Sequence, residues 1–326
     1  MKKICVNDLK SGDLLTKDVI SNEGVLLIKA GTELTDWQIK CLKRNVQTVE
    51  IDESGGSWNL TALDLKERLD ACLKEDPINS YRIRELILKE IAGDRKNLEK
   101  LAALKKFSQE TYVHSINVCV RVTKYVCDWY NKDLVPEVIV ASIFHDIGKI
   151  KIPIEILEKT DKLSSKERKI INEHSLIGAE ILNGYSKKIV KAVLHHHEEY
   201  NGKGYPSKLK GKDIPEFAMV IKIFDSFTAL IEDRPYRGKY SKQQAIEILL
   251  KGSGKEYDPQ ILDDILSKIE PYSLGDRVIL EDTDEEAIVI GKSKIKPYFP
   301  IVRITSNRKF TTVDLGTSKE TIKKDL

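Results

Sequence analysis

The longest uniform pattern in this sequence is helical, and it limits the fold more than any other feature. From about residue 60 to 270, apolar side chains recur at the 3.6-residue spacing of amphipathic helices, and no alternating strand of any length interrupts them. Shorter apolar runs, broken by turn residues, occupy both ends of the chain. The pattern predicts a mainly α protein in which a central all-helical domain is flanked by two small domains.

The two ends share signals for short strands. Residues 1–52 carry apolar runs separated by turn residues such as Gly12-Asp13, which favour β-hairpins, and a helix capped by Thr35 is expected before a last strand at 46–51. Ser54-Gly55-Gly56-Ser57 has the composition of a linker. From residue 274 onward, four short apolar runs again alternate with turn residues. These boundaries divide the chain into a small N-terminal α/β domain (1–56), a helical linker region (57–100), the main helical domain (101–270) and a small C-terminal β-rich domain (271–326).

Composition and charge narrow the functional classes. The 326 residues include 41% hydrophobic and 32% charged ones, as in globular proteins, and the formal net charge is +3. So small a charge provides no extended positive surface, and we expect no bulk nucleic acid as a partner. The apolar runs fall far short of the ~20 residues that a membrane helix needs, and the start lacks a signal-peptide core. We therefore expect a cytoplasmic protein with no membrane span, whose five scattered cysteines are reduced.

All six histidines lie between residues 114 and 197. The adjacent pair His145-Asp146 follows an apolar run, and it places an imidazole and a carboxylate at one point, as a divalent metal site requires. The alternative is an ordinary helix C-terminus in which Gly148 is a left-handed cap. This pair alone leaves both interpretations open.

His114 and His174 each fall on an apolar helical stripe, so both should point inward. Glu110 precedes His114 by one turn on the same face, which makes the two a ligand-compatible pair. A lone histidine in such a place is usually a hydrogen-bonded core residue. Two buried imidazoles need partners for their ring nitrogens, and a shared metal ion supplies these more readily than separate hydrogen bonds do.

Two further groups point to the same chemistry. Asp225 lies in an otherwise apolar helix, so its carboxylate must be exposed, paired with a cation, or bound to a metal. The run His195-His196-His197 ends a helix and leads into a tight loop at 201–206. Because consecutive helical side chains diverge by about 100°, at most two of these three histidines can serve neighbouring metal ions.

The central domain contains five motifs in a fixed order: HDIGKIKIP, INEHSLIGAEIL, HHEEYNGKGYP, IKIFDSFTAL and DRPYRGKYS. Their order and spacing, over roughly 100–268, resemble those of the HD-GYP branch of the HD phosphohydrolases. The resemblance implies that residues 101–270 form an HD-type catalytic domain, and that the protein is a cyclic di-GMP phosphodiesterase of bacterial second-messenger signalling. The family uses two or three divalent metal ions, iron or manganese above all. The implied metal ligands are Glu110, His114, His145, Asp146, His174, His196, His197 and Asp225.

The resemblance also implies roles toward the substrate. Asp146 and Lys149 would be catalytic, and Glu110 would be a ligand of a third metal ion. The implied substrate contacts are Lys149, Arg234, Arg237, Gly204 and Tyr205. The expected product is linear pGpG, followed by GMP if the second bond is also cut. The family further allows a homodimer and a protein partner bound through the terminal domains.

Asn201 and Thr228 depart from the family, which usually has Asp at both positions. Asn201 can still make a tight turn, whereas Thr228 lacks a charge one turn from Asp225 and weakens the support of that ligand. Two alternatives therefore stay open: a catalytically weak cyclic-dinucleotide sensor, and an HD phosphohydrolase that acts on another cyclic dinucleotide or nucleotide. The complete ligand set and Lys149 favour an enzyme.

Overall fold

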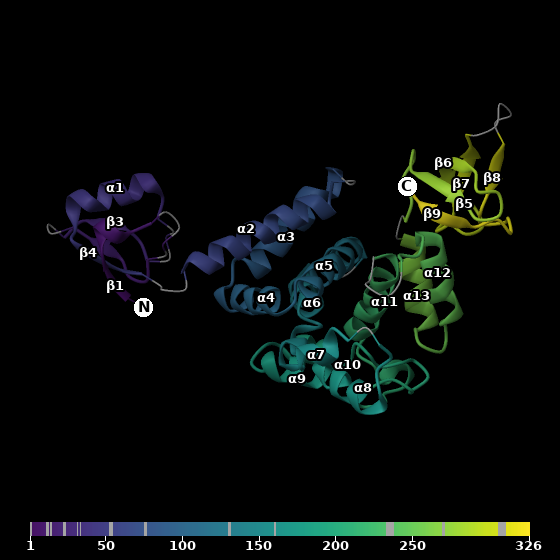
Figure 1. Cartoon of the computed structure of the whole chain (residues 1–326), viewed down its shortest axis with the longest axis horizontal. Coiled ribbons are helices and arrows are strands. Elements are labelled where there is room, and N and C mark those ends of the chain that lie inside the picture. The colour runs from purple at the N-terminus through teal and green to yellow at the C-terminus, as the bar shows by residue number, and fades with distance from the viewer. Residues whose placement is uncertain are drawn as a thin grey trace.

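The computed structural model describes the chain except for residues 1, 11, 12, 14, 22, 23, 31, 33, 52–54, 75, 76, 130, 131, 160, 233–237, 269, 270 and 306–310. The N-terminal domain contains β1 (Lys2–Cys5), the 3-10 turn η1 (Val6–Asp8), β2 (Val19–Ile20), β3 (Leu26–Ile28), α1 (Asp36–Asn45) and β4 (Thr48–Ile51). β1 pairs with β4 and β2 with β3, both antiparallel, around a hydrophobic core of their own (Figure 1). Thr35 caps α1 in a reciprocal capping box with Gln38, as the sequence predicts.

Helices dominate the rest of the chain up to residue 268, which confirms the mainly α fold. They are α2 (Gly55–Cys72), α3 (Pro77–Ile91), α4 (Arg95–Phe107), α5 (Gln109–Trp129), α6 (Val135–Ile143), α7 (Ile154–Leu157), α8 (Ser165–Asn172), α9 (His174–Ile181), α10 (Lys187–His195), α11 (Glu216–Ile231), α12 (Lys242–Lys251) and α13 (Pro259–Lys268). The 3-10 turns η2 (Lys132–Leu134), η3 (Ile147–Lys151) and η4 (Gly211–Asp213) connect some of them. In the parts of the chain that the structure describes, no helix has the length and apolar composition to cross a membrane.

The apolar helix α6 lies at the centre of this arrangement. It packs against α5, α10 and α3, and seven of its nine residues are buried, which explains why it lacks the polar stripe of a surface helix. The chain leaves α6 through the turn His145-Asp146 and continues into η3, which packs against α9. The predicted His-Asp pair is thus anchored between the most buried helix and α9.

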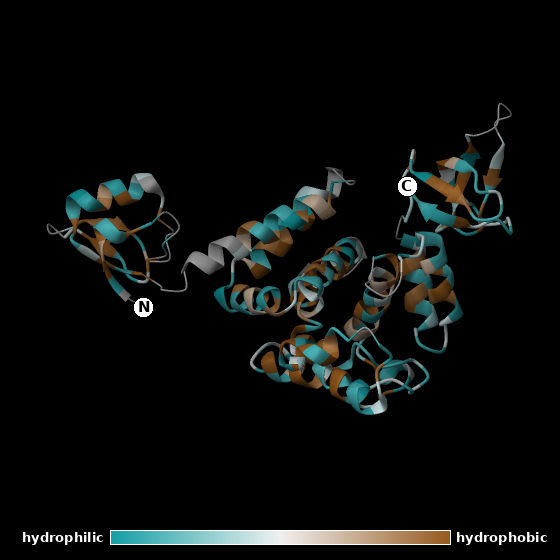
Figure 2. Cartoon of the chain, in the orientation of Figure 1, coloured by the Kyte–Doolittle hydropathy of each residue, from teal (hydrophilic) through white to brown (hydrophobic). Residues whose placement is uncertain are grey.

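The region 57–100, assigned to a linker from the sequence, packs into the main core. Leu65 and Leu69 of α2 and Ile87 of α3 belong to the same hydrophobic cluster as residues of α5 and α6. Figure 2 shows apolar and hydrophilic stripes along α2 and α3. The linker prediction is wrong for Gly55 to Ser57, which begin α2. The low helix propensity of Gly acts mainly in the interior of a helix, so two glycines at its start do not prevent α2 from forming.

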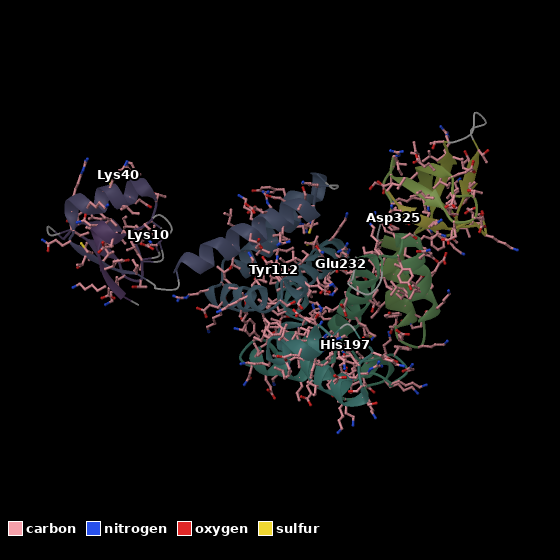
Figure 3. All side chains as sticks on the ribbon, in the orientation of Figure 1. Lys10, Lys40, Tyr112, His197, Glu232 and Asp325 are labelled. Carbon is pink, nitrogen blue, oxygen red and sulfur yellow. The ribbon has the colours of Figure 1, made fainter. Side chains whose placement is uncertain are left out.

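The C-terminal domain is a five-stranded antiparallel sheet in the order β8-β7-β6-β5-β9. Its strands are β5 (Arg277–Leu280), β6 (Glu286–Lys292), β7 (Pro300–Ile304), β8 (Thr312–Asp314) and β9 (Ile322–Asp325). The sequence predicted a β-rich domain but not β9, whose IKKD lacks an apolar alternation. Hydrogen bonds hold this edge strand to α12: the Ser241 hydroxyl donates to the Ile322 carbonyl at 2.6 Å, and the Lys242 N–H donates to Asp325, labelled in Figure 3, at 3.0 Å. The sheet is therefore docked on the helical domain through its last strand.

Candidate metal centre

Five separate segments bring histidines and aspartates together inside the helical domain. In two groups, the potential ligand atoms lie within 4.8 Å of one another. The first group comprises Asp146, His174, His196 and His197, and the second comprises His114, His145 and Asp225. Seven of the eight ligands implied by the resemblance thus converge. Figure 3 places the labelled His197 in this part of the chain.

Asp146 joins the two groups. Its Oδ1 lies 3.3 Å from His174 Nε2 in the first group, and its Oδ2 lies 3.4 Å from His145 Nε2 in the second. Burial would raise the pKa of this carboxyl, but the charge of Lys149 and the adjacent His145 and His174 hold the pKa well below its usual range. Asp146 is therefore ionised, and it would be able to contribute an oxygen to a cation in each group.

The same kind of backbone contact orients three of the imidazoles. In His145, His174 and His196, Nδ1 lies 2.7, 2.6 and 2.7 Å from the backbone carbonyl three residues earlier. A carbonyl can only accept, so each Nδ1 carries the proton and each Nε2 carries a lone pair. All three Nε2 atoms face the cluster, which is the arrangement that backbone contacts impose on metal-binding histidines.

These lone pairs face one another. His174 Nε2 lies 3.4 Å from His196 Nε2, and both atoms lack a proton in the tautomer fixed by the backbone. Burial lowers the pKa of His174, and it lowers that of His196 to about 3, so neither ring becomes cationic at neutral pH. His145 Nε2 and Asp146 Oδ1 are buried without a hydrogen-bond partner. Buried acceptors without donors are costly unless a cation lies among them, so these residues fit divalent metal ions.

His114 completes the second group in a different way. Its Nε2 lies 2.8 Å from Asp225 Oδ1, and its Nδ1 lies 2.8 Å from Glu232 Oε2. Burial would lower the pKa of His114, but the hydrogen bonds with the two carboxylates outweigh it and raise the pKa to about 9. Glu232 was not predicted from the sequence, because it follows the last residue of α11 and helical periodicity does not say where a side chain beyond a helix end points.

A cavity of about 350 Å³ opens onto the two groups. It is lined by Gln109, Glu110, Thr111, Val113, His114, Asn117, Asp146, Lys149 and Glu232. Lys149 Nζ lies 2.6 Å from Asp146 Oδ2, so its ammonium group stands at the edge of the metal groups. Glu110 lines the cavity but is exposed and belongs to neither ligand group, and its role toward a third metal ion stays a prediction. Arg234 and Arg237 lie outside the described residues.

The loop after α10 covers the first group from another side. The Tyr205 ring stacks on His197, with centroids 4.8 Å apart and planes inclined by 24°. Gly204 allows the close approach of the loop, because a Cβ there would lie 2.3 Å from the Glu199 backbone nitrogen. Asn201 Oδ1 accepts from the Lys203 N–H at 2.8 Å, which is the turn predicted for this departure from the family. Contacts of Gly204 and Tyr205 with a substrate remain predictions.

Glu198 holds this loop in place and was not singled out from the sequence. The carboxylate is buried; Oε1 accepts from the Ser207 N–H at 2.6 Å, and Oε2 from the Leu209 N–H at 3.1 Å. His195 is the histidine outside both ligand groups, and its Nδ1 lies 3.6 Å from Glu198 Oε1. The resemblance likewise left His195 as the extra one.

We expect Glu198→Ala to loosen the loop, because the substitution leaves two backbone N–H groups without an acceptor. The free energy of unfolding should fall by about 3 kcal/mol, since an unsatisfied buried donor costs about 1–3 kcal/mol. Amide hydrogen exchange at Ser207 and Leu209 should accelerate, and chemical denaturation measures the loss. Glu199→Ala, at the adjacent half-buried position, is the control. Unchanged exchange at both amides would contradict this role of Glu198.

Comparisons with known proteins agree with this geometry. A family model described as HD domain matches residues 96–261, a range that contains both ligand groups. A cyclic di-GMP phosphodiesterase of Pseudomonas aeruginosa is 33% identical over 188 residues, which cover 56% of this chain and 45% of that protein. A probable cyclic di-GMP phosphodiesterase of Vibrio cholerae is 31% identical over 253 residues, or 71% of this chain and 56% of that protein. A 3′3′-cGAMP-specific phosphodiesterase of the same species is 35% identical over 136 residues, or 40% and 26%. The chain spans about half or less of the length of these relatives.

Proposed function

Because the chain belongs to the HD domain family, we propose that it is a metal-dependent phosphodiesterase that hydrolyses a cyclic dinucleotide, with cyclic di-GMP as the substrate. The observation that carries the proposal is the set of buried, proton-free nitrogens that face one another beside Asp146. Buried acceptors that face one another are costly unless a cation lies among them. The relatives named above are phosphodiesterases of cyclic dinucleotides, which supports the substrate class.

Two ions would be held by the two groups, with Asp146 between them. Metal ions in such a site neutralise phosphate oxygens and lower the pKa of water. Histidine and carboxylate ligands without cysteine suit first-row transition metals, and we propose iron or manganese. A third ion would involve Glu110, which lies in the same cavity as His114.

We assign the remaining roles to residues that would contact the substrate. The Lys149 ammonium, at the cavity wall, would stabilise the negative charge that develops as the 3′-oxygen leaves. Arg234 and Arg237 would hold the phosphates through bidentate hydrogen bonds. Gly204 and Tyr205 would form a wall for the substrate on the side of His197.

We propose that cyclic di-GMP is hydrolysed to linear pGpG, and that a second cleavage gives GMP. The relatives include enzymes for 3′3′-cGAMP, so that dinucleotide is the competing substrate. The second candidate function is a catalytically weak sensor, which is favoured by one observation: the Thr228 hydroxyl is buried without a hydrogen-bond partner where the family has a carboxylate. A cytoplasmic location, a homodimer and partners bound through the terminal domains stay predictions.

Turnover of both dinucleotides by anaerobically purified protein tests the proposal. The protein is supplied with Fe(II) or Mn(II), and the products are separated by chromatography. We expect metal-dependent formation of pGpG, faster from cyclic di-GMP than the corresponding cleavage of 3′3′-cGAMP. Bound metal with no cleavage of either dinucleotide would favour the sensor, and the opposite order of rates would reassign the substrate.

A further inference from the structure

We infer that Glu232 is a positioning residue for His114: its carboxylate accepts from Nδ1 and holds the imidazole so that Nε2 points at Asp225, where a metal ion would take the place of the Nε2 proton. Through this contact it sets how tightly the group of His114, His145 and Asp225 binds its ion. The inference rests on the proposed metal centre and adds to it a residue that the resemblance does not assign.

His114 differs from the other oriented histidines in how its Nδ1 is held. Backbone carbonyls hold Nδ1 of His145, His174 and His196. In His114, the partner of Nδ1 is a side chain, Glu232 Oε2, at 2.8 Å. A carboxylate with no proton can only accept, so Nδ1 donates to Glu232, and Nε2 is held 2.8 Å from Asp225 Oδ1, inside the second group. Among these four rings, His114 is therefore the one whose orientation a single substitution can release.

Glu232 is itself held in place across two helices. Its Oε1 accepts from Asn117 Nδ2 at 2.5 Å, and Asn117 lies one turn after His114 on α5. Its own N–H donates to the Thr228 carbonyl at 3.1 Å, and α11 ends there because the backbone of Glu232 is extended. The carboxylate thus joins α5 to the end of α11, and it contacts His114 with one oxygen while the other is restrained. In Figure 3 the labelled Glu232 lies near α5 and α11.

The position of Glu232 also accounts for the departure at Thr228. Thr228 is fully buried and its hydroxyl has no hydrogen-bond partner, so it gives the metal groups no support. Glu232 lies four residues later, just past the end of α11, and its carboxylate contacts His114, which in turn contacts Asp225. Although residue 228 provides no charge, Asp225 is linked through His114 to the carboxylate of Glu232.

Titration of metal-free protein with Mn(II), followed by electron paramagnetic resonance, tests the inference without using activity. The variants are Glu232→Leu, which keeps the size but removes the acceptor, and Glu232→Gln, which keeps an acceptor oxygen. We expect Glu232→Leu to weaken one class of Mn(II) site by about 10- to 100-fold, as losses of such supporting contacts do. The other class, at Asp146, His174, His196 and His197, should keep its affinity, and Glu232→Gln should lose less than Glu232→Leu.

Controls separate positioning from folding. Glu180→Gln, an exposed position on α9, removes one negative charge and should leave both Mn(II) affinities unchanged. Each metal-free variant is also melted, and Glu232→Ala repeats the titration with a side chain too small to clash. Wild-type affinity at both sites in the Leu and Ala variants would overturn the inference, as would an equal loss in the Gln and Leu variants. A wild-type protein that binds no Mn(II) would instead overturn the proposed function.

Discussion

Replacing Asp146 by Ala is expected to abolish phosphodiester cleavage and to remove bound metal. The two oxygens of this carboxylate face different ligand groups, at 3.3 Å from His174 Nε2 and 3.4 Å from His145 Nε2, so one substitution damages both positions. It also frees Lys149, whose ammonium is held by Oδ2 at 2.6 Å. Loss of a single group that stabilises a transition state already costs about 10²–10³-fold in rate, and we expect a loss of about 10³-fold or more here.

The measurement pairs turnover with metal content on the same sample. Asp161→Ala, an exposed aspartate outside the ligand groups, controls for the loss of one charge and should retain both properties. Wild-type turnover by the Asp146→Ala protein would show that Asp146 is not part of the metal centre.

Gly148→Ala should have the largest effect on stability of any single methyl addition near the site. A Cβ on Gly148 would lie 1.9 Å from the His174 carbonyl oxygen and 2.6 Å from the Gly178 nitrogen. These are backbone atoms and cannot rotate away, so η3 and α9 would have to separate. Overpacking of this kind costs about 1–3 kcal/mol, and we expect the upper end, about 3 kcal/mol. The separation would also draw Asp146 from His174 and weaken metal binding.

Chemical denaturation of metal-free protein measures this cost. Gly238→Ala is the matched control, because a Cβ at Gly238 meets no atom of the described residues within 4 Å and its backbone needs no positive φ. The control should change the free energy of unfolding by less than about 0.5 kcal/mol. A Gly148→Ala protein that unfolds at the wild-type midpoint would contradict the contact between η3 and α9.

Gly148 also shows where prediction from sequence ends. The pair His145-Asp146 was recognised as a candidate ligand pair, and the competing interpretation made Gly148 a left-handed helix cap. Gly148 is not among the glycines with positive φ, so that interpretation is wrong. The glycine is needed because α9 passes directly over it, 26 residues later at His174. A contact between distant segments leaves no local pattern, so sequence periodicity could not reveal it.

Other features also divide into those that local sequence signals predict and those that depend on contacts between distant segments. The cap at Thr35 and the helical centre follow from local signals, and the structure confirms both. Glu232 and strand β9 depend on partners more than 75 residues away, His114 and Ser241 respectively, and were missed. The ligand histidines were found because inward-facing imidazoles on apolar stripes are unusual, and because their motifs resemble a known family. Which ring nitrogen of each histidine carries the proton could be determined only from the structure.

The most direct test of the account is the rate of cyclic di-GMP cleavage as metal-free protein is titrated with Mn(II). The account predicts no turnover without metal, and a rate that rises until two or three equivalents per chain are bound. Full turnover by protein that contains almost no metal would contradict the central claim.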